Sequence, residues 1–435
     1  MIRKTLTGLA LMLMAAFANA QSADSTQAGP IELTLEKAKQ YAMEHNRTVQ
    51  ASDLSVKKAE AAKWEALSNM LVTVDATLSY QNFLGFELNF GGQAIPMPNT
   101  GNLGIQAAIA FNGQILVGYQ LSKMAIDMQN LSKQNDELTV KNNVTTSYLT
   151  VLIAEESYKI LKDSRDNLEK TYNNVNQLAK VGMTEQTQAD QLKVQLMSLD
   201  NQLRSAQRNI ELAYNALRLQ LGTSADAELD IQEDLNYYFE TTDAVAETLD
   251  QEHSLDNNIS IQLLEKNIEL QEKQVTLKRW AYGPTLSFAW QYSGKTYFGK
   301  KEGLNMQPPN VIVATLNVPI FSSGKRYMQV KQQKIAVDIE KTKKEEAIDG
   351  LRVQERQLTF NLTSALETYE TAKQSVELNQ KIFKNQLQKY EQGMVSSTDL
   401  ITVNNTLLQS QGSYIQSLYD VMQAQTSLLQ LYNKL

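Results

Sequence analysis

Hydrophobic residues recur along this chain with two different periods. From residue 192 to 217 they are spaced alternately four and three apart, and an equivalent run extends from Leu400 to Leu431. A heptad repeat of this kind predicts helices that supercoil against their neighbours. Small and polar residues interrupt the second run at Ser410, Ser417 and Ala424. They indicate close packing in a curved array rather than a simple dimer.

Four shorter segments alternate between apolar and polar residues, as strands with two unlike faces do. They lie near residues 71–81, 103–112, 285–292 and 311–321. Each has about ten residues, the length of an outer-membrane strand that faces lipid on one side and water on the other. A half-buried sheet in a soluble protein has the same alternation. The strand length and the aromatic residues near the strand ends favour a membrane sheet: Trp280, Tyr282, Tyr292, Tyr297 and Phe298.

The chain is an internal duplication. Gly113 recurs as Gly324, and Gly182-Met183 recurs as Gly393-Met394, at one offset of about 211 residues. We therefore expect a first repeat at 21–222 and a second at 257–435, joined by an acidic, irregular connector at 223–256. Each repeat reads as helix, strand, strand, very long helix and medium helix.

Helix lengths predict how each repeat is arranged. The long helices near 114–181 and 325–392 would each measure roughly 100 Å. The medium helices near 33–69 and 185–221 would each measure about 55 Å, so two laid end to end match one long helix. Gly182 and Gly393 then mark hairpin tips, where each long helix turns back.

Composition narrows the function classes. The chain has 435 residues, a formal charge of −7 and no cysteine. Residues 1–20 read as a secretory signal peptide, with Arg3 and Lys4 before an apolar core and Ala18-Asn19-Ala20 at the cleavage site. Its removal would leave a charge of about −9, which argues against a nucleic-acid partner. The absence of cysteine excludes disulfides, thiol nucleophiles and lipid attachment through cysteine.

Signatures of catalysis are missing from the sequence. The two histidines, His45 and His253, lie far apart without paired ligands nearby. No zinc-protease, Walker or dinucleotide-binding motif occurs. We therefore expect no enzymatic activity, no metal site and no cofactor, and any transport energy would come from a partner.

Four membrane strands cannot close a barrel by themselves, and an open edge in lipid leaves backbone groups unsatisfied. Two copies would give eight strands, whose interior is filled by side chains. Three copies would give twelve strands and leave a lumen. A trimer is thus the simplest assembly that both closes and conducts.

Two motifs and the duplicated order of elements carry a family resemblance. The segments "NVPIFSSGKR" (317–326) and "YEQGMVSSTDL" (390–400) resemble those of the TolC family of outer-membrane efflux proteins. The resemblance implies a mainly α protein with membrane β structure. Four strands per protomer would complete a twelve-stranded trimeric β-barrel on a long periplasmic α-helical barrel. It further implies contact with outer-membrane lipid, docking to a periplasmic adaptor protein and an inner-membrane transporter, and passive conduction of drugs or small molecules.

The resemblance also indicates site residues. Asp399 matches the family's acidic entrance position, with Tyr390 on the other arm of the hairpin. Three symmetry-related Asp399 carboxylates would repel one another, favour cations and have raised pKa values. Asp399 could equally cap the start of a helix.

This sequence departs from the family pattern at several positions. The first repeat has Gln188 where the second has Asp399, the family's second entrance acid falls at Thr402, and its gating arginine falls at Val395. A family-type latch is therefore not expected. The hairpin tips, with Gly182, Met183, Gly393 and Met394, are expected to face the adaptor.

Two other functions are compatible with the sequence. A duct for type I protein secretion has the same architecture, and nothing in the sequence separates it from a drug efflux duct. A non-conducting structural coiled-coil protein belongs to a different class. The paired amphipathic strands in both repeats argue against it.

Overall fold

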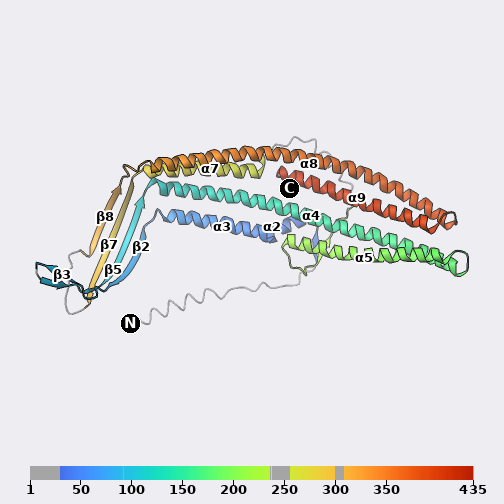
Figure 1. Cartoon of the computed structure of the whole chain (residues 1–435), viewed down its shortest axis with the longest axis horizontal. Coiled ribbons are helices and arrows are strands. Elements are labelled where there is room, and N and C mark those ends of the chain that lie inside the picture. The colour runs from blue at the N-terminus through green and yellow to red at the C-terminus, as the bar shows by residue number, and fades with distance from the viewer. Residues whose placement is uncertain (1–29, 92, 236, 238–254, 299–307, 435) are drawn as a thin grey trace.

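The structure, a computed structural model, describes residues 30–91, 93–235, 237, 255–298 and 308–434. The protein is elongated, with a small sheet at one end and a long helical body that ends in two hairpin tips (Figure 1). The predicted signal peptide at 1–20 and most of the second half of the predicted connector, 238–254, lie outside the described residues.

Two very long helices run the length of the body, and shorter helices pack end to end along each of them (Figure 1). The long helices have 68 and 67 residues, so each extends about 100 Å. The α-helices are α2 (Leu35–His45), α3 (Arg47–Ser68), α4 (Gly113–Lys180), α5 (Gln186–Leu221), α7 (Ile259–Arg279), α8 (Lys325–Glu391) and α9 (Ser397–Leu431). Two short 3₁₀ turns, η2 (Leu255–Asn257) and η3 (Trp280–Tyr282), flank α7.

The expectation of one continuous helix at 33–69 is wrong. Strand β1 (Ile31–Leu33) precedes α2, and the helix breaks at Asn46, which has extended ψ of 131°. The buried Asn46 side chain accepts a hydrogen bond from Thr48 N–H at 2.7 Å and donates one to the Gln220 carbonyl at 2.6 Å. The Asn46 side chain thus caps the start of α3 and links it to the last turn of α5.

The second repeat has the same joint. Asn258, also buried, accepts from Ser260 N–H at 2.9 Å and donates to the Leu431 carbonyl at 2.7 Å. In each repeat one asparagine therefore connects the end of the hairpin helix to the start of the helix that leads to the sheet.

The expectation of an irregular connector is wrong for one segment. Strand β6 (Leu229–Ile231) pairs in parallel with β1, with Ile31 opposite Leu229. The buried Tyr148 hydroxyl of α4 donates to the Leu33 carbonyl at 3.3 Å and holds this pair against the helices. The connector is thus joined to β1 at mid-body.

The main sheet is antiparallel, in the order β2-β5-β7-β8. Its strands are β2 (Thr73–Gln81), β5 (Asn99–Phe111), β7 (Thr285–Phe298) and β8 (Asn310–Asn317), and the loop after β2 carries the small hairpin of β3 (Glu87–Phe90) and β4 (Gln93–Pro96). Strands β5 and β7 are longer than expected because they extend each other, from Asn99 opposite Phe298 onward. The fourth strand ends at Asn317 rather than near 321, since Pro319 has no N–H to donate.

Strand register places the two kinds of residue on opposite faces. Leu78 lies opposite Leu103, and Trp290 lies opposite both Ala107 and Ile312, so these apolar residues share one face. Polar residues share the other face, where Asp75 is opposite Gln106 and Gln106 is opposite Gln291. The apolar face is uncovered in the protomer, with Leu78 84% and Ile312 78% exposed.

The core follows the predicted heptad positions. Leu192, Leu199 and Leu217 are fully buried, as are Val421 and, nearly so, Leu400. The largest apolar cluster lies at mid-body, and a smaller one lies between α4 and α5 near the tips.

Within the described residues, no helix combines the length and the apolar character that crossing a membrane requires.

Candidate channel entrance

The first hairpin tip joins α4 to α5 through a glycine in the left-handed region. Gly182 has φ of 77° and donates to the Ala179 carbonyl at 3.0 Å, while Met183 N–H donates to the Leu178 carbonyl at 2.9 Å. This is the Schellman pair of hydrogen bonds that ends a helix, and glycine supplies the positive φ without strain.

The second tip repeats this geometry between α8 and α9. Gly393 has φ of 73° and donates to the Tyr390 carbonyl at 2.9 Å, and Met394 N–H donates to the Lys389 carbonyl at 2.9 Å. Both tip methionines are exposed, Met183 by 76% and Met394 by 69%. The two repeats therefore present two similar tips with an apolar side chain on each.

The turns differ where the next helix begins. Ser396 and Asp399 form a capping box at the start of α9, in which Asp399 N–H donates to Ser396 Oγ at 3.2 Å and Ser396 N–H donates to Asp399 Oδ2 at 3.1 Å. At the start of α5, Thr184 Oγ1 instead donates to Gln188 Oε1 at 3.2 Å. Only the second tip therefore carries a carboxylate at this position.

The Asp399 carboxylate is ionised more readily than usual. Hydrogen bonds from the Ser396 hydroxyl, at 2.7 Å, and from its N–H lower the pKa of Asp399. This direction is opposite to the rise expected for three neighbouring carboxylates, because the capping bonds act here on a lone, exposed carboxylate.

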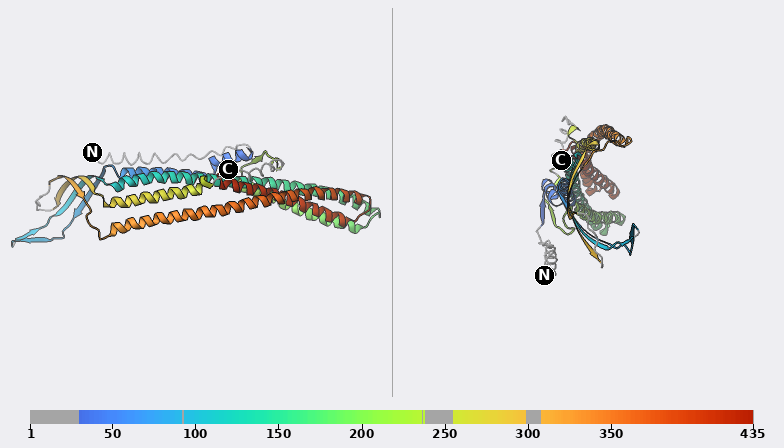
Figure 2. Two further views of the ribbon diagram at one scale, coloured as in Figure 1. Left: turned by 90° about the horizontal axis from the view of Figure 1, so that it is seen from above. Right: turned by 90° about the vertical axis from the view of Figure 1, so that its left-hand side faces the viewer.

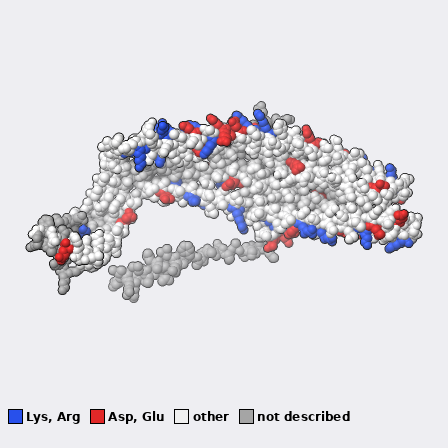
Figure 3. Space-filling view, viewed as in Figure 1, with Lys and Arg blue, Asp and Glu red and all other residues white. Residues whose placement is uncertain are grey.

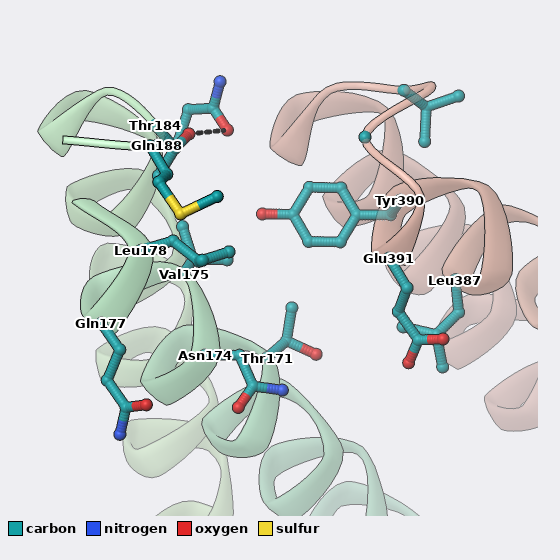
Figure 4. A pocket seen from close by; sticks show the side chains of 13 residues that line it. Thr171, Asn174, Val175, Gln177, Leu178, Thr184, Gln188, Leu387, Tyr390 and Glu391 are labelled. Carbon is teal, nitrogen blue, oxygen red and sulfur yellow. Dashed lines mark hydrogen bonds between the residues drawn. The ribbon is translucent and has the colours of Figure 1, made fainter. Parts of the chain in front are cut away.

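A groove of about 670 Å³ separates the two tips. Tyr390 projects from α8 into the space between the hairpins, toward the side that carries Leu178, Thr184 and Gln188 (Figure 4). Burial raises the pKa of the Tyr390 hydroxyl, which keeps it neutral. The groove is thus lined by uncharged polar and apolar side chains, with Glu391 at its edge.

Polar side chains link the hairpins below this groove. Gln191 Oε1 accepts from Ser397 Oγ at 3.1 Å and from Thr398 Oγ1 at 3.3 Å. Gln195 Nε2 donates to Asn405 Oδ1 at 2.8 Å. These hydrogen bonds join α5 to α9, and Ile401 and Leu408 of α9 add apolar contacts to the cluster between α4 and α5.

One buried group in this region is incompletely satisfied. Asn404 is 4% exposed, and its oxygen accepts from Ser164 Oγ at 3.3 Å. Its Nδ2 has no hydrogen-bond partner among the described residues. An unpaired buried amide N–H costs free energy, so this position is not optimised for stability of the protomer alone.

Comparison with known proteins finds a family similarity in the second half of the chain. Residues 252–434 match the model of the outer membrane efflux protein family. This part of the chain is therefore similar to outer membrane efflux proteins. The match lies in the second repeat, and the first repeat has the same order of elements. No curated protein matches the sequence.

Solved outer-membrane channels have the same fold. The chain is similar to the Campylobacter jejuni CmeC channel, with a TM-score of 0.73, 16% identity, and coverage of 95% of this chain and 90% of that one. The open state of the Neisseria gonorrhoeae MtrE channel gives a TM-score of 0.71 and 16% identity, with coverage of 96% of this chain and 94% of that one. VceC of Vibrio cholerae gives a TM-score of 0.70 and 12% identity, with coverage of 92% of this chain and 95% of that one. The TolC-like fold expected from the sequence is confirmed.

Residues 252–434 thus resemble outer membrane efflux proteins, and the chain has the fold of solved outer-membrane channels. The described residues contain no group of three or more His, Cys, Asp or Glu side chains suited to a metal ion. His45 stacks on Tyr41 and bonds its carbonyl, while His253 lies outside the described residues.

The structure brings only some of the predicted site residues together. Tyr390, Gln188, Met183 and Gly393 line the groove, together with Val395. Asp399, Met394 and Thr402 are exposed and lie outside the lining, and Thr402 Oγ1 donates to the Thr398 carbonyl.

Sequence reasoning missed the hydrogen bonds between Gln191 and Ser397 and between Gln195 and Asn405. Glutamines on the polar side of a heptad helix give no signal of their own. Only the buried small residue Ser397, directly after the N-cap of α9, could have indicated a close approach of a second helix.

Proposed function

We propose that this protein is the protomer of a homotrimeric outer-membrane exit duct in a tripartite efflux system. The duct passively conducts drugs or small molecules that a periplasmic adaptor and an inner-membrane transporter deliver. The observation that carries the proposal is that the two lateral sides of the protomer are complementary. One side is formed by β2, α3 and α5, and the other is formed by β8 and α8.

The lateral order of elements is the same in the sheet and in the helical body. The sheet runs β2-β5-β7-β8, and the helices run α3 with α5, then α4, then α7 with α9, then α8. Strand β2 directly follows α3, and β8 directly precedes α8. Seen along the long axis, the elements form a curved, open array (Figure 2). One neighbour can therefore meet β8 and α8 with its own β2, α3 and α5.

Both flanks have the chemistry of an interface. Strands β2 and β8 each have one edge without a partner strand in the described protomer, which is untenable in lipid. The helical flanks expose large apolar side chains along their length. On α8 these include Met328, Ile335, Ile339, Val353 and Phe360, and on α3 and α5 they are Leu54, Trp64, Val194, Met197, Leu212 and Leu219. Further copies would cover both flanks.

Three copies fit conduction best. A barrel of eight strands is filled by its own side chains, whereas twelve strands leave a lumen. The polar face of the sheet, which includes Asp75, Gln106 and Gln291, would line that lumen, and the apolar face would meet lipid.

The hairpin tips supply the proposed entrance and docking site. We assign the entrance to Asp399, Tyr390, Gln188 and Thr402, because they flank the two helix starts at the open end of the body. We assign adaptor docking to Gly182, Met183, Gly393 and Met394, because the tips expose apolar side chains at the end farthest from the sheet.

The proposal is tested by measuring oligomer mass and planar-bilayer conductance on the same detergent-purified protein. A trimer with discrete, cation-selective conductance supports the exit duct. A monomer without conductance contradicts it, and would make the alternating strands an ordinary sheet.

A further inference from the structure

Four cations lie where the helical body meets the sheet. Lys278 and Arg279 are in the last turn of α7, just before β7 begins at Thr285. Lys325 and Arg326 open α8, just after β8 ends at Asn317. We call these four residues the basic collar. In the space-filling view, Lys and Arg side chains gather at the end of the body that adjoins the strands (Figure 3).

Among the described residues, no collar side chain forms an ion pair. From Lys325 the first acidic residue along α8 is Asp338. Farther down the body, the same two helices do pair their charges: Lys341 lies 3.1 Å from Glu272, and Lys344 lies 2.8 Å from Glu265. The cations next to the sheet thus lack the ion pairs that Lys341 and Lys344 form farther along the body.

Helix stability does not account for the two collar residues that open α8. Cations at the end of α7 suit the helix dipole, but Lys325 and Arg326 occupy the positive end of α8, where cations are unfavourable. Gly324 caps that helix without a side-chain hydrogen bond, and no acid lies in its first turn. A ligand with negative charge at this position would offset the repulsion.

The neighbouring side chains are those of a membrane interface. Ile320 is 93% and Phe321 84% exposed, directly between β8 and α8. Trp280 and Tyr282 follow the collar residues of α7 and are also exposed. Aromatic residues at the end of a membrane strand are typical of the boundary between hydrocarbon and headgroups.

The guanidinium of Arg326 is fixed at this boundary. Its Nη1 donates to the Pro319 carbonyl at 3.0 Å, and the group lies 5.6 Å from the centre of the Tyr282 ring. These contacts leave further N–H donors of the guanidinium available, and such donors match phosphate oxygens well.

We propose that the basic collar binds the headgroup phosphates of anionic phospholipids in the periplasmic leaflet of the outer membrane. This inference rests on the proposed channel, whose sheet lies in the membrane. Helices rise 1.5 Å per residue, so the first turn lies within about 5 Å of the helix end. That distance matches a headgroup layer of roughly 5–8 Å on each side of the hydrocarbon. The apolar residues beside the collar would meet the acyl chains of the same lipids.

The experiment is native mass spectrometry of the full-length protein titrated with phosphatidylglycerol or, separately, with phosphatidylcholine. The wild type is expected to retain phosphatidylglycerol preferentially. The collar variant Lys278→Gln, Arg279→Gln, Lys325→Gln, Arg326→Gln is expected to bind it about tenfold more weakly or worse, since each cation near an anionic surface contributes to attraction. Binding of phosphatidylcholine should stay unchanged.

A matched control removes the same charge at the opposite end of the body. Lys180, Lys193, Lys384 and Lys389 are exposed lysines near the hairpin tips, and their replacement by Gln should leave lipid preference intact. Because Arg326 also contacts Pro319 and Tyr282, a second variant keeps Arg326 and changes only the other three collar residues. It should show the same direction of change.

Three results would overturn the proposal. The wild type could bind both lipids equally, the collar variants could keep the preference, or inorganic phosphate at equal concentration could displace the lipid, which would indicate a site for free anions. Oligomer mass and conductance of the same samples separate this outcome from failure of the channel itself. A wild type that assembles and conducts without lipid preference refutes only the collar.

Discussion

At the scale of single residues, Asp399 combines two requirements that can be separated. The capping box needs an oxygen that accepts from Ser396 N–H, and that oxygen need not be charged. The proposed entrance needs the negative charge. Gln188 occupies the equivalent place in the first repeat and bonds Thr184 without any charge, so a neutral residue is compatible with this turn.

Asp399→Asn should therefore leave the helix start intact and change only the entrance. We expect divalent cations to block the single-channel current about tenfold more weakly, because close approach of opposite charges contributes roughly this much at a partly screened site. The measurement is the blocking concentration in planar bilayers. Asp190→Asn is the control, since Asp190 is another exposed carboxylate near the tip. Unchanged block in Asp399→Asn would remove this residue from the entrance.

Two substitutions of the tip glycine Gly393 separate the effect of backbone strain from the effect of a blocked docking surface. At Gly393 an added Cβ would meet nothing within 4 Å, but φ is 73°. Gly393→Ala therefore costs only about 1–2 kcal/mol of local strain. Gly393→Arg adds charge and bulk at the surface and should abolish efflux while the trimer still forms. Drug susceptibility of cells and oligomer mass are the measurements, and normal efflux in Gly393→Arg would contradict adaptor docking here.

At the scale of elements, the joints at Asn46 and Asn258 hold each repeat together. Both side chains cap one helix and donate to the last turn of another, 174 and 173 residues away. This hydrogen bond connects the short helices that pack along the long helix of each repeat. Gly222, at the end of α5, approaches the joint so closely that a Cβ would lie 2.3 Å from the His45 carbonyl oxygen.

Asn46→Asp and Asn258→Asp test the joint, because aspartate keeps the capping oxygen but loses the amide donor. Each is expected to lower stability by about 1–3 kcal/mol, since a buried carbonyl loses its partner and faces an acid. Thermal unfolding followed by circular dichroism measures the effect.

The matched control for the joint is Asn112→Asp. Asn112 caps α4 by accepting from Ile115 N–H at 2.8 Å. An acid there should be neutral or slightly stabilising, because it keeps the cap and suits the helix dipole. Equal losses of stability in Asn112→Asp and Asn46→Asp would show that the hydrogen bond from the Asn46 side chain to the Gln220 carbonyl contributes nothing beyond the cap.

The same elements show what a sequence can and cannot predict here. The heptads predicted the buried positions, for instance Leu192 and Leu199, because burial on a helix depends on local periodicity. The alternating strands predicted the two faces of the sheet for the same reason. The hairpin tips followed from Gly182 and Gly393, since positive φ after a long helix favours glycine.

Features set by distant partners escaped prediction. The break at Asn46 depends on the Gln220 carbonyl, and β1 forms only against β6, about two hundred residues on. The extra length of β5 and β7 comes from their mutual pairing through Gly101 and Gly294, which have little strand preference. At the candidate entrance, the bond from Ser397 to Gln191 likewise joins segments with no common local signal.

At the scale of the whole molecule, the free flanks decide whether the protein can work as a duct. Val353 and Phe360 lie on the face of α8 opposite the buried Leu362, and each is 69% exposed. Their positions on the helix place them against a neighbour in the proposed ring. Asn361 is also exposed, but it lies about 100° around the helix from Phe360, away from that contact.

Val353→Lys combined with Phe360→Lys should therefore prevent assembly, because closing the ring would bury two unpaired charges in an apolar seam. The protomer should keep its helical content, since neither side chain contributes to its core. Asn361→Lys adds charge on the same helix and is expected to remain trimeric. Oligomer mass in detergent, with circular dichroism on the same samples, gives the answer. A folded trimer in the double variant would mean that α8 does not face a second copy, and that the ring must close through other surfaces.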